Sequence, residues 1–171
     1  MHRPSLTEYA PYFEKYIALV PEENILSALE AQLDEMIILL RGVPEAEANV
    51  RHAPYTWSVK EVVGHLTDSE RIFGYRALRF ARGDSTPLPG FDENVYVQAA
   101  KFDHLRLTNL MGEFETVRRS HVYFFRSLNE AAWSRVGEAN GNAMSVRALV
   151  YAIVGHARHH TAILRKRLGK S

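Results

Sequence analysis

The sequence predicts an all-α fold, a four-helix bundle with one long crossover connection. Four stretches of roughly 20 residues carry apolar side chains at helical spacing, and no segment shows the alternation of a strand. The connection between the second and third stretches, residues 83–102, is about 20 residues long, which is typical of a lid or a crossover. The chain has 171 residues, so we expect one domain, residues 1–171.

The first long helix is expected over residues 23–42, after a short opening helix near residues 6–16. Its apolar residues recur at three- and four-residue intervals, which is the spacing of one helix face. They are Ile25, Leu29, Leu33, Met36, Ile37 and Leu40. Pro44 and Pro54 in the following segment interrupt this pattern, so the helix ends before them.

The second long helix is expected from Ser58 to about Arg82, and its N-terminus has two local signals. Ser58 and Glu61 have the spacing of a capping box, in which each side chain accepts a hydrogen bond from the backbone amide of the other residue. Trp57 and Val62 occupy the two positions of a hydrophobic staple. Together these signals predict where the helix begins.

The third long helix is expected over residues 104–128, with Asp103 as its candidate cap. In the crossover before it, the segment FDENVYVQAA predicts a helical turn. The apolar spacing continues through the aromatic segment HVYFFRSL, so this segment is interpreted as helix rather than strand. A short helix capped by Asn129 is expected next.

The fourth long helix is expected from Ser145 to about Leu168. The segment EANGNAM before it is interpreted as a turn. Gly169 is placed where a helix stop is common. With this helix the four members of the predicted bundle are complete.

The composition excludes several kinds of site and partner. The formal net charge of +1 gives no general attraction to nucleic acid or to an anionic membrane. The absence of cysteine means that any metal must be held by histidine, carboxylates or water, and it fits the cytosol. No apolar run approaches the roughly 18 residues of a membrane span, and the N-terminus lacks a signal-peptide core. We therefore expect a cytoplasmic protein without nucleic-acid or membrane partners.

Three histidines lie close together in the last helix, in VGHARHHTAIL. His156 and His160 are four residues apart, so their side chains lie about 40° apart around the helix and about one turn apart along it. Both can therefore reach one metal ion. His159 is displaced by about 60° to the other side of His156 and is interpreted as a bystander. The same pair could also be hydrogen-bonded core residues.

His65 offers a third imidazole from the apolar face of the second long helix. Gly64 precedes His65, and Gly155 precedes His156. Glycine inside a helix costs about 1 kcal/mol relative to alanine, which indicates close packing here or simply a tight helix contact. Three imidazoles from two helices leave coordination positions open, as catalytic metal sites do. Nitrogen ligands suit zinc, nickel, copper or iron.

Three segments also carry a family resemblance: WSVKEVVGHLTDSERIFGYRALRFARGD, PLPGFDENVY and ANGNAMSVRALVYAIVGHARHH. With them, nearly the whole chain resembles the DinB/YfiT-like family of metal-dependent four-helix-bundle proteins. The most specific marks are Gly-His-Leu in the second long helix and His-x-x-His-His in the last. The resemblance implies a homodimer and a divalent metal ion held, by motif, by His65, His156 and His160. Zinc or nickel is expected first, with iron, manganese or copper as alternatives.

The resemblance says less about the reaction. Some members of that family transfer low-molecular-weight thiols, and one branch is a mycothiol-dependent isomerase. We therefore expect a metal-dependent enzyme that activates a low-molecular-weight thiol or water for attack on a small-molecule electrophile, as a thiol S-transferase or a related hydrolase does. The alternatives are a non-catalytic metal- or ligand-binding module of a stress response and an interaction bundle whose histidines are incidental.

Several acidic and polar residues are weaker candidates for the site. Asp68 follows His65 by three residues and could orient a ligand imidazole or act as a base, although a solvated helix carboxylate is the preferred interpretation. Glu70 is expected on the surface. In the crossover, Asp92, Asn94 and Tyr96 could reach the mouth of the site, although local turn chemistry explains them more simply.

Other residues stand out by type. The basic residues of RALRFARGD could bind anionic groups of a thiol, but a solvated basic stripe is the preferred interpretation; they are Arg76, Arg79 and Arg82. The aromatic run Tyr123, Phe124 and Phe125 is expected in the core or at a dimer interface. Three further histidines have no evident partner and are expected to be structural or exposed: His52, His104 and His121.

Overall fold

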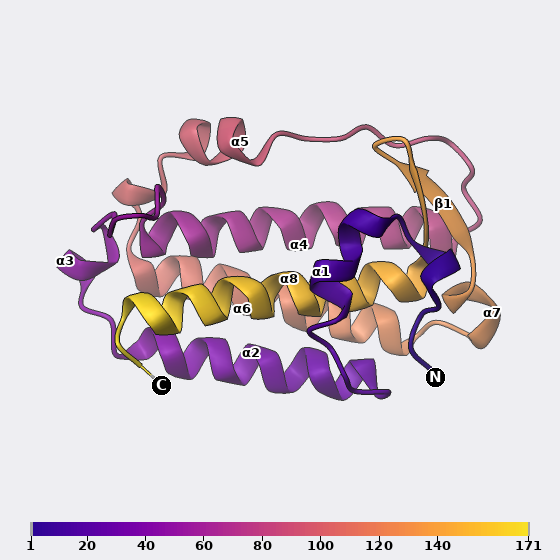
Figure 1. The fold of residues 1–171 in the computed structure, drawn as a ribbon, viewed down its shortest axis with the longest axis horizontal. Helices are drawn as coiled ribbons and strands as arrows, with labels where there is room; N and C mark the ends of the chain where they lie inside the picture. Colours follow the sequence, from indigo (N-terminus) through magenta and orange to yellow (C-terminus); the bar gives the residue numbers. More distant parts are fainter. Residues whose placement is uncertain (1, 171) are drawn as a thin grey trace.

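The computed structural model describes residues 2–170 and shows the predicted four-helix bundle (Figure 1). The four long helices are α2 (Ile25–Arg41), α4 (Val59–Ala81), α6 (Leu107–Arg126) and α8 (Val146–Arg167). Three of them begin at a polar cap whose side chain accepts a hydrogen bond from a backbone amide three residues on: Asn24, Ser58 and Ser145. The capping box of Ser58 and Glu61 is present as predicted.

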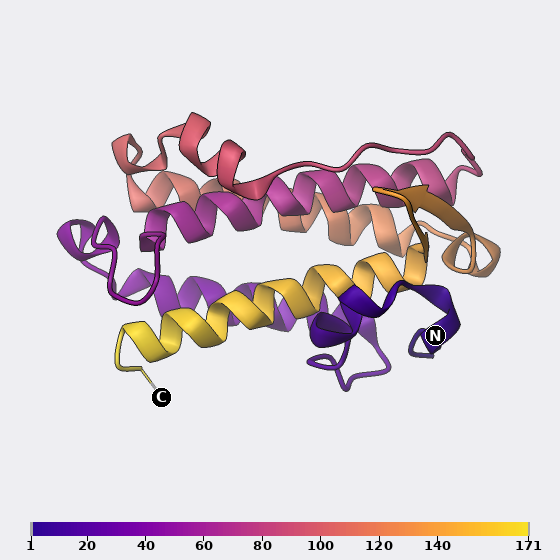
Figure 2. The same cartoon turned by 45° about the horizontal axis from the view of Figure 1, so that its top comes forward.

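The four helices form a closed ring in which α2 and α4 each pack against both α6 and α8. The neighbours α4 and α6 run parallel, because Arg71 pairs with Glu113 in one part and Arg82 lies over Phe124 near both C-terminal ends. The chain therefore has to return along the bundle between them. The crossover makes this return over the outside of α4 (Figure 2).

The crossover contains helix α5 (Glu93–Ala100) and a 3-10 turn over Phe102–His104. Phe102 is buried against the backbone of α4, where a Cβ atom added to Gly64 would lie 2.4 Å from the Phe102 ring. This contact explains Gly64. The chain turns again before α6, so Asp103 lies in the 3-10 turn and the prediction that it caps α6 was wrong. Arg106 takes the cap position.

A β-hairpin joins the short helix α7 (Glu130–Trp133) to α8, and the expectation of no strand was wrong here. Strand β1 (Val136–Ala139) pairs antiparallel with β2 (Asn142–Ser145). The two residues between them, Asn140 and Gly141, have φ angles of 52° and 70°, which is the geometry that favours an Asn-Gly hairpin turn. Leu88 of the crossover exchanges two backbone hydrogen bonds with the hairpin, so the hairpin holds the crossover in place.

The opening helix is shorter than predicted and is broken into pieces. Two 3-10 turns (Leu6–Glu8 and Pro11–Phe13) precede a single turn of α-helix, α1 (Glu14–Ile17). This segment packs on α8, where a Cβ atom added to Gly155 would lie 2.0 Å from the backbone carbonyl oxygen of Tyr16. Gly155 therefore allows α1 to approach α8 at the level of the neighbouring His156.

The core consists of two clusters of buried apolar side chains, one toward each end of the bundle. On α8 the clusters divide between Val154 and Ala157, and His156 lies at this division. The remaining short helix, α3 (Glu45–Ala48), lies in the connection between α2 and α4. Within residues 2–170, no helix has both the length and the apolar character that crossing a membrane requires.

Candidate metal centre

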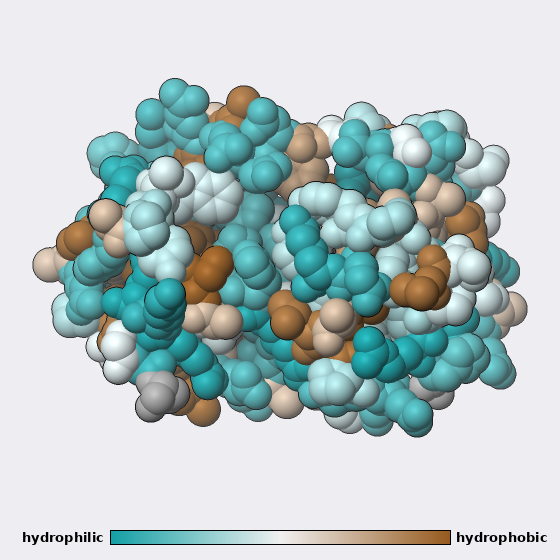
Figure 3. Space-filling model, in the orientation of Figure 1, coloured by the Kyte–Doolittle hydropathy of each residue, from teal (hydrophilic) through white to brown (hydrophobic). Residues whose placement is uncertain are grey.

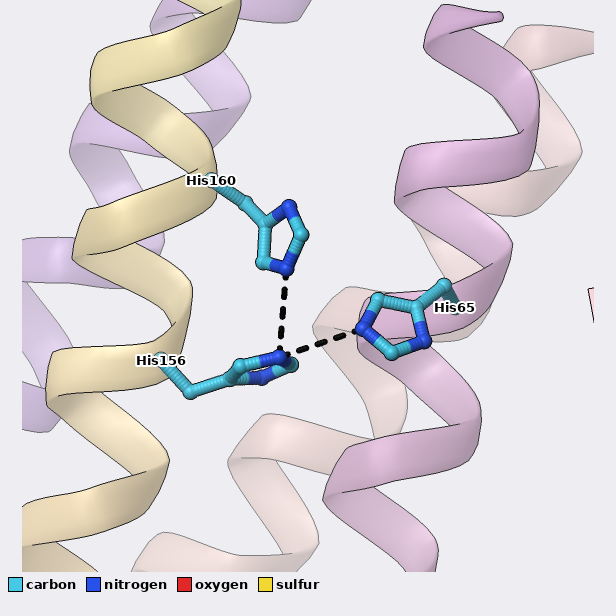
Figure 4. Close-up of side chains that lie close together, drawn as sticks. All are labelled: His65, His156 and His160. Atoms are coloured by element: carbon cyan, nitrogen blue, oxygen red, sulfur yellow. Dashed lines mark hydrogen bonds between the residues drawn. The ribbon is translucent and has the colours of Figure 1, made fainter. Parts of the chain in front are cut away.

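Three histidine side chains converge between α4 and α8 (Figure 4). The Nε2 atom of His156 lies 3.1 Å from that of His65 and 3.2 Å from that of His160. One ligand atom of each residue lies within 4.8 Å of those of the other two. The α8 pair has the four-residue spacing that places both rings on one face, and the neighbouring helix α4 brings His65 against them.

Burial keeps these imidazoles neutral. It lowers the pKa of His65 to about 4, and burial together with the charges of His65 and His159 lowers the pKa of His160 to about 3. The pKa of His156 is lowered well below its usual range by burial first and by the neighbouring histidines second. At neutral pH all three rings therefore carry a free nitrogen lone pair, which is the form that binds a metal ion.

The contacts among the three rings fit a shared cation better than a set of hydrogen bonds. A neutral imidazole nitrogen has either one proton or one lone pair, yet Nε2 of His156 faces two other Nε2 atoms at contact distance. Two nitrogens bound tetrahedrally to zinc at about 2.0–2.1 Å would be about 3.3 Å apart. The separations of 3.1 and 3.2 Å are close to that value, so the three residues fit a divalent ion.

Aromatic side chains hold the three rings in position. The Trp57 ring centroid lies 4.7 Å from that of His65 and 6.5 Å from that of His160, with the latter pair stacked. Tyr16 of α1 packs edge-on against His156 with a centroid distance of 5.3 Å. His159 is exposed and lies outside the converging set, with its ring edge-on to that of Tyr16.

The triad lies at the side of an open cleft of about 340 Å³. The N-terminal segment, α4, α8, the crossover and the hairpin turn all contribute side chains to its walls. The space-filling view shows a hollow near the middle of this face, between α5 and α1 (Figure 3). A small molecule entering the cleft can therefore reach one side of the triad, whereas helices enclose the other sides.

The two acidic residues near His65 do not join the triad. Asp68 contacts none of the three rings among the described residues; it lies 3.7 Å from Arg71, and burial raises its pKa. Glu70 was expected on the surface, and this was wrong. Its side chain is 4% exposed and accepts hydrogen bonds from Arg118 at 2.5 Å and from His121 at 3.0 Å. Its position faces α6 rather than α8.

The crossover residues proposed for the mouth mostly have other roles. Asp92 caps α5 by accepting hydrogen bonds from the amides of Asn94 and Val95, so the simpler interpretation was correct. Tyr96 is exposed and neither it nor Asn94 lines the cleft. Glu93, which lies between Asp92 and Asn94, does line the cleft. The helical turn of α5 directs the side chains at 94 and 96 away from the cleft.

The three arginines of α4 do not form one solvated stripe. Arg79 pairs with Asp84 and Tyr75, and Arg82 is exposed over the ring of Phe124. Arg76, by contrast, is buried and lines the cleft. The prediction of a solvated basic stripe was therefore wrong for Arg76.

The remaining residues singled out from the sequence differ in burial and in hydrogen bonding. In the aromatic run, Phe125 is fully buried, Phe124 packs against the core and Tyr123 is 74% exposed. His104 is exposed, and His121 bonds with Glu70. The ring nitrogen Nε2 of His52 is buried without a hydrogen-bond partner in the part of the chain that the structure describes.

Several residues of the cleft wall were not among the predicted site residues. Tyr16, Ser69 and Phe73 line it, as does Trp57, which was predicted only as part of a staple. A local signal existed for two of them, because Ser69 and Phe73 follow His65 at successive intervals of four residues on one helix face. Tyr16 had no such signal, since its place depends on the contact of α1 with α8.

Comparison with known proteins identifies the family. The model of the DinB superfamily matches residues 28–164. A protein of Bacillus licheniformis named "Putative metal-dependent hydrolase" is 29% identical over 161 residues, covering 84% of this chain and 91% of that protein. A protein of the same description from Geobacillus thermodenitrificans is 24% identical over 149 residues, covering 84% of each chain.

Two solved structures share the fold. YfiT from Bacillus subtilis, described as "a probable metal-dependent hydrolase with an unusual four-helix bundle topology", has a TM-score of 0.75 at 17% identity and covers 89% of this chain and 91% of its own. The mycothiol-dependent maleylpyruvate isomerase has a TM-score of 0.72 at 17% identity and covers 86% of this chain and 62% of its own. Because the family model spans most of its length, the chain belongs to the DinB superfamily.

Proposed function

We propose that this protein is a metal-dependent enzyme in which His65, His156 and His160 hold a divalent ion. Its reaction is the attack of a low-molecular-weight thiol or of water on a small electrophile. One observation carries the proposal: the neutral imidazoles of two buried histidines and one half-buried histidine converge at the side of an open cleft. Three protein ligands leave coordination positions free, which distinguishes catalytic zinc sites from closed structural ones. Zinc or nickel suits this donor set.

The side chains of this chain prepare the site for such chemistry. A divalent ion held there supplies Lewis acidity, which makes a thiol or water a stronger nucleophile at neutral pH. Trp57 and Tyr16 hold the imidazoles in position and cover part of the cleft wall. Burial raises the pKa of Tyr16 above its usual range, so its hydroxyl keeps its proton and remains a hydrogen-bond donor in the cleft.

The related proteins support both nucleophiles. The names of the two relatives describe a metal-dependent hydrolase, which favours water as the nucleophile. The isomerase that shares the fold depends on the thiol mycothiol, which favours a thiol. We place the thiol first, because a cleft of about 340 Å³ with several aromatic residues in its wall accommodates a ligand much larger than water.

Turnover assays with matched variants test the proposal. Zinc- or nickel-loaded protein is assayed with a panel of low-molecular-weight thiols and either monobromobimane or chlorodinitrobenzene, and in parallel with activated esters in the absence of thiol. We expect thiol-dependent turnover that is lost in His160→Ala and kept in His159→Ala, whose ring lies outside the triad. Turnover of esters alone would identify a hydrolase. A metal-loaded protein that turns over neither substrate class would contradict an enzyme and favour a non-catalytic metal-binding module.

A further inference from the structure

Arg76 is a buried cation in the wall of the cleft, and the metal chemistry proposed above does not use it. The residue is 6% exposed. Its guanidinium lies over the rings of Phe73 and Phe91, with centroid distances of 5.8 and 6.0 Å. One of its nitrogens donates a hydrogen bond of 2.9 Å to the backbone carbonyl of Pro89. A guanidinium has five N–H donors, so most of its donor capacity remains unused.

No carboxylate within residues 2–170 forms an ion pair with Arg76. Burial lowers the pKa of its guanidinium, which reflects the cost of removing a charge from water without a counterion. Elsewhere in the bundle a buried arginine is paired, since Arg118 bonds to the carboxylate of Glu70. An unpaired arginine in a cleft wall therefore indicates a missing anionic partner.

Ser69 is a second unpartnered polar group in the same wall. It is 2% exposed, and its hydroxyl has no hydrogen-bond partner among the residues that the structure covers. Ser69 and Arg76 are seven residues apart, so they lie within about 20° of each other on α4. Both line the cleft that holds the triad.

The charges of the cleft favour an anion. Lys15 and Arg76 contribute two positive charges to its wall, and Glu93 contributes one negative charge. The ammonium of Lys15 lies over the rings of Tyr12 and Tyr16. The cleft therefore carries net positive charge even before any metal ion is counted.

The spacing along α4 sets the shape of the ligand. His65 and Arg76 are eleven residues apart, which places them within about 20° around the helix and about 16 Å apart along its axis. Side chains on a helix lean toward its N-terminus, so the long Arg76 side chain reaches back toward His65, while the shorter His65 side chain leans away from Arg76. A molecule that joins the two ends is elongated, with roughly 10 Å between its reactive atom and its acid group.

We infer that Arg76 and Ser69 bind the carboxylate of an elongated substrate whose reactive end lies at the histidine triad. The guanidinium fork matches the two oxygens of a carboxylate, and the Ser69 hydroxyl is free to donate a further hydrogen bond. For the identity of the reactive end the inference rests on the proposed function. The substrate class is thus an acid-bearing thiol, or an acid-bearing electrophile presented to one.

Calorimetric titration of the metal-loaded protein with two matched probes tests this inference. The probes are 6-mercaptohexanoate and 6-mercaptohexanol, which share the thiol and the chain and differ only in the acid group. In the wild type we expect the acid to bind at least about 10-fold more tightly, the usual range for a bond to a charged group. In Arg76→Met the acid should lose this advantage, with the alcohol unaffected. Arg76→Lys should keep part of it.

Three controls separate a binding role from a structural one. Arg79→Met removes a neighbouring arginine that is already paired with Asp84, and it should bind both probes as the wild type does. The melting temperature and metal content of Arg76→Met should stay at wild-type values. The shorter acid 3-mercaptopropionate should bind equally to the wild type and to Arg76→Met, because it does not span the distance to residue 76.

The possible results have distinct meanings. An equal preference for the acid in the wild type and in Arg76→Met would overturn the inference, as would a wild type that does not distinguish the two probes. If the alcohol fails to bind while the acid binds in an Arg76-dependent manner, the proposed thiol chemistry is wrong and the acid site stands. If both thiols bind without dependence on Arg76, the proposed function stands and the acid site is wrong.

Discussion

In the triad, His65 and His156 are buried and His160 is half-buried, and this burial determines their protonation. In the unfolded chain a histidine titrates near pH 6.5, whereas the pKa of His65 in the folded protein is about 4 and that of His160 about 3. Between pH 6.5 and the lowered pKa of each histidine, the unfolded chain binds a proton that the folded chain does not. Stability therefore falls as the pH decreases from about 6.5 toward 4.

This difference predicts the pH dependence of the metal-free protein. Its free energy of unfolding, measured with urea, should be constant above pH 7 and should decline below about 6.5, each such histidine contributing at most about 1.4 kcal/mol per pH unit. His65→Asn removes one titrating group and should show a shallower decline. Identical pH profiles for the two proteins would show that His65 is not held neutral by the fold.

Buried polar side chains also stabilise the bundle away from the cleft. Arg118 is fully buried and connects three helices, because it donates hydrogen bonds to Glu70 of α4 and to Gln32 and the carbonyl of Leu29 in α2. Removal of one partner of a buried ion pair leaves the other charge unpaired, which usually costs about 3–5 kcal/mol. We expect Arg118→Met to lose about that much stability.

The neighbouring Arg119 provides the matched comparison. It is exposed and pairs with Glu115 on the same helix, so Arg119→Met should change the urea midpoint little. Equal midpoints for the two variants would contradict the assigned role of Arg118.

At the level of elements, two glycines in long helices have opposite expected effects. A Cβ atom at Gly155 would lie 2.0 Å from the backbone oxygen of Tyr16, whereas one at Gly112 would have no neighbour within 4 Å. Gly155→Ala should push α1 away from α8 and destabilise the protein by about 1–3 kcal/mol. Gly112→Ala should stabilise it by up to about 1 kcal/mol, because alanine favours helix.

Urea unfolding of both glycine variants checks this pair of expectations. If Gly155→Ala is as stable as the wild type and keeps the environment of Tyr16, the close contact between α1 and α8 is wrong. A destabilising Gly112→Ala would show that the middle of α6 is packed more tightly than the structure indicates.

Local signals predicted the elements that depend on neighbouring residues. Ser58 and Ser145 marked the starts of α4 and α8, because a cap acts within one helical turn. The hairpin also had a local signal, the Asn140–Gly141 pair, but its strands of four residues are too short to show alternation. Asp103 was misplaced because the fold of the crossover, and not the local sequence, sets the start of α6.

The residues of the site divide in the same way: those with a local sequence signal were predictable, and those placed by long-range contacts were not. The convergence of His65, His156 and His160 was predictable because helical spacing and a family motif agree on it. The burial of Glu70 was not, since its partner Arg118 is 48 residues away. Arg76 appeared to be one of three similar arginines, and only the packing of the crossover over α4 distinguishes it.

At the level of the whole molecule, we propose the homodimer that the family resemblance predicts. Of the aromatic run 123–125, Tyr123 alone is exposed enough to reach a partner. Sedimentation equilibrium should give twice the mass of the chain for the wild type and a weaker dimer for Tyr123→Ser, with the helical content unchanged. A monomeric wild type would contradict the expectation of a dimer, and an unchanged dimer in the variant would move the interface elsewhere.

One divalent ion is expected at one place in the bundle, where α4 and α8 bring three imidazoles together. The most direct measurement is the metal content of purified protein, by mass spectrometry, after loading with zinc or nickel and dialysis. We predict one ion per chain in the wild type and in His159→Ala, and none in His65→Ala, His156→Ala or His160→Ala. A wild type without stoichiometric metal, or triad variants that keep it, would contradict the assignment of these histidines as ligands.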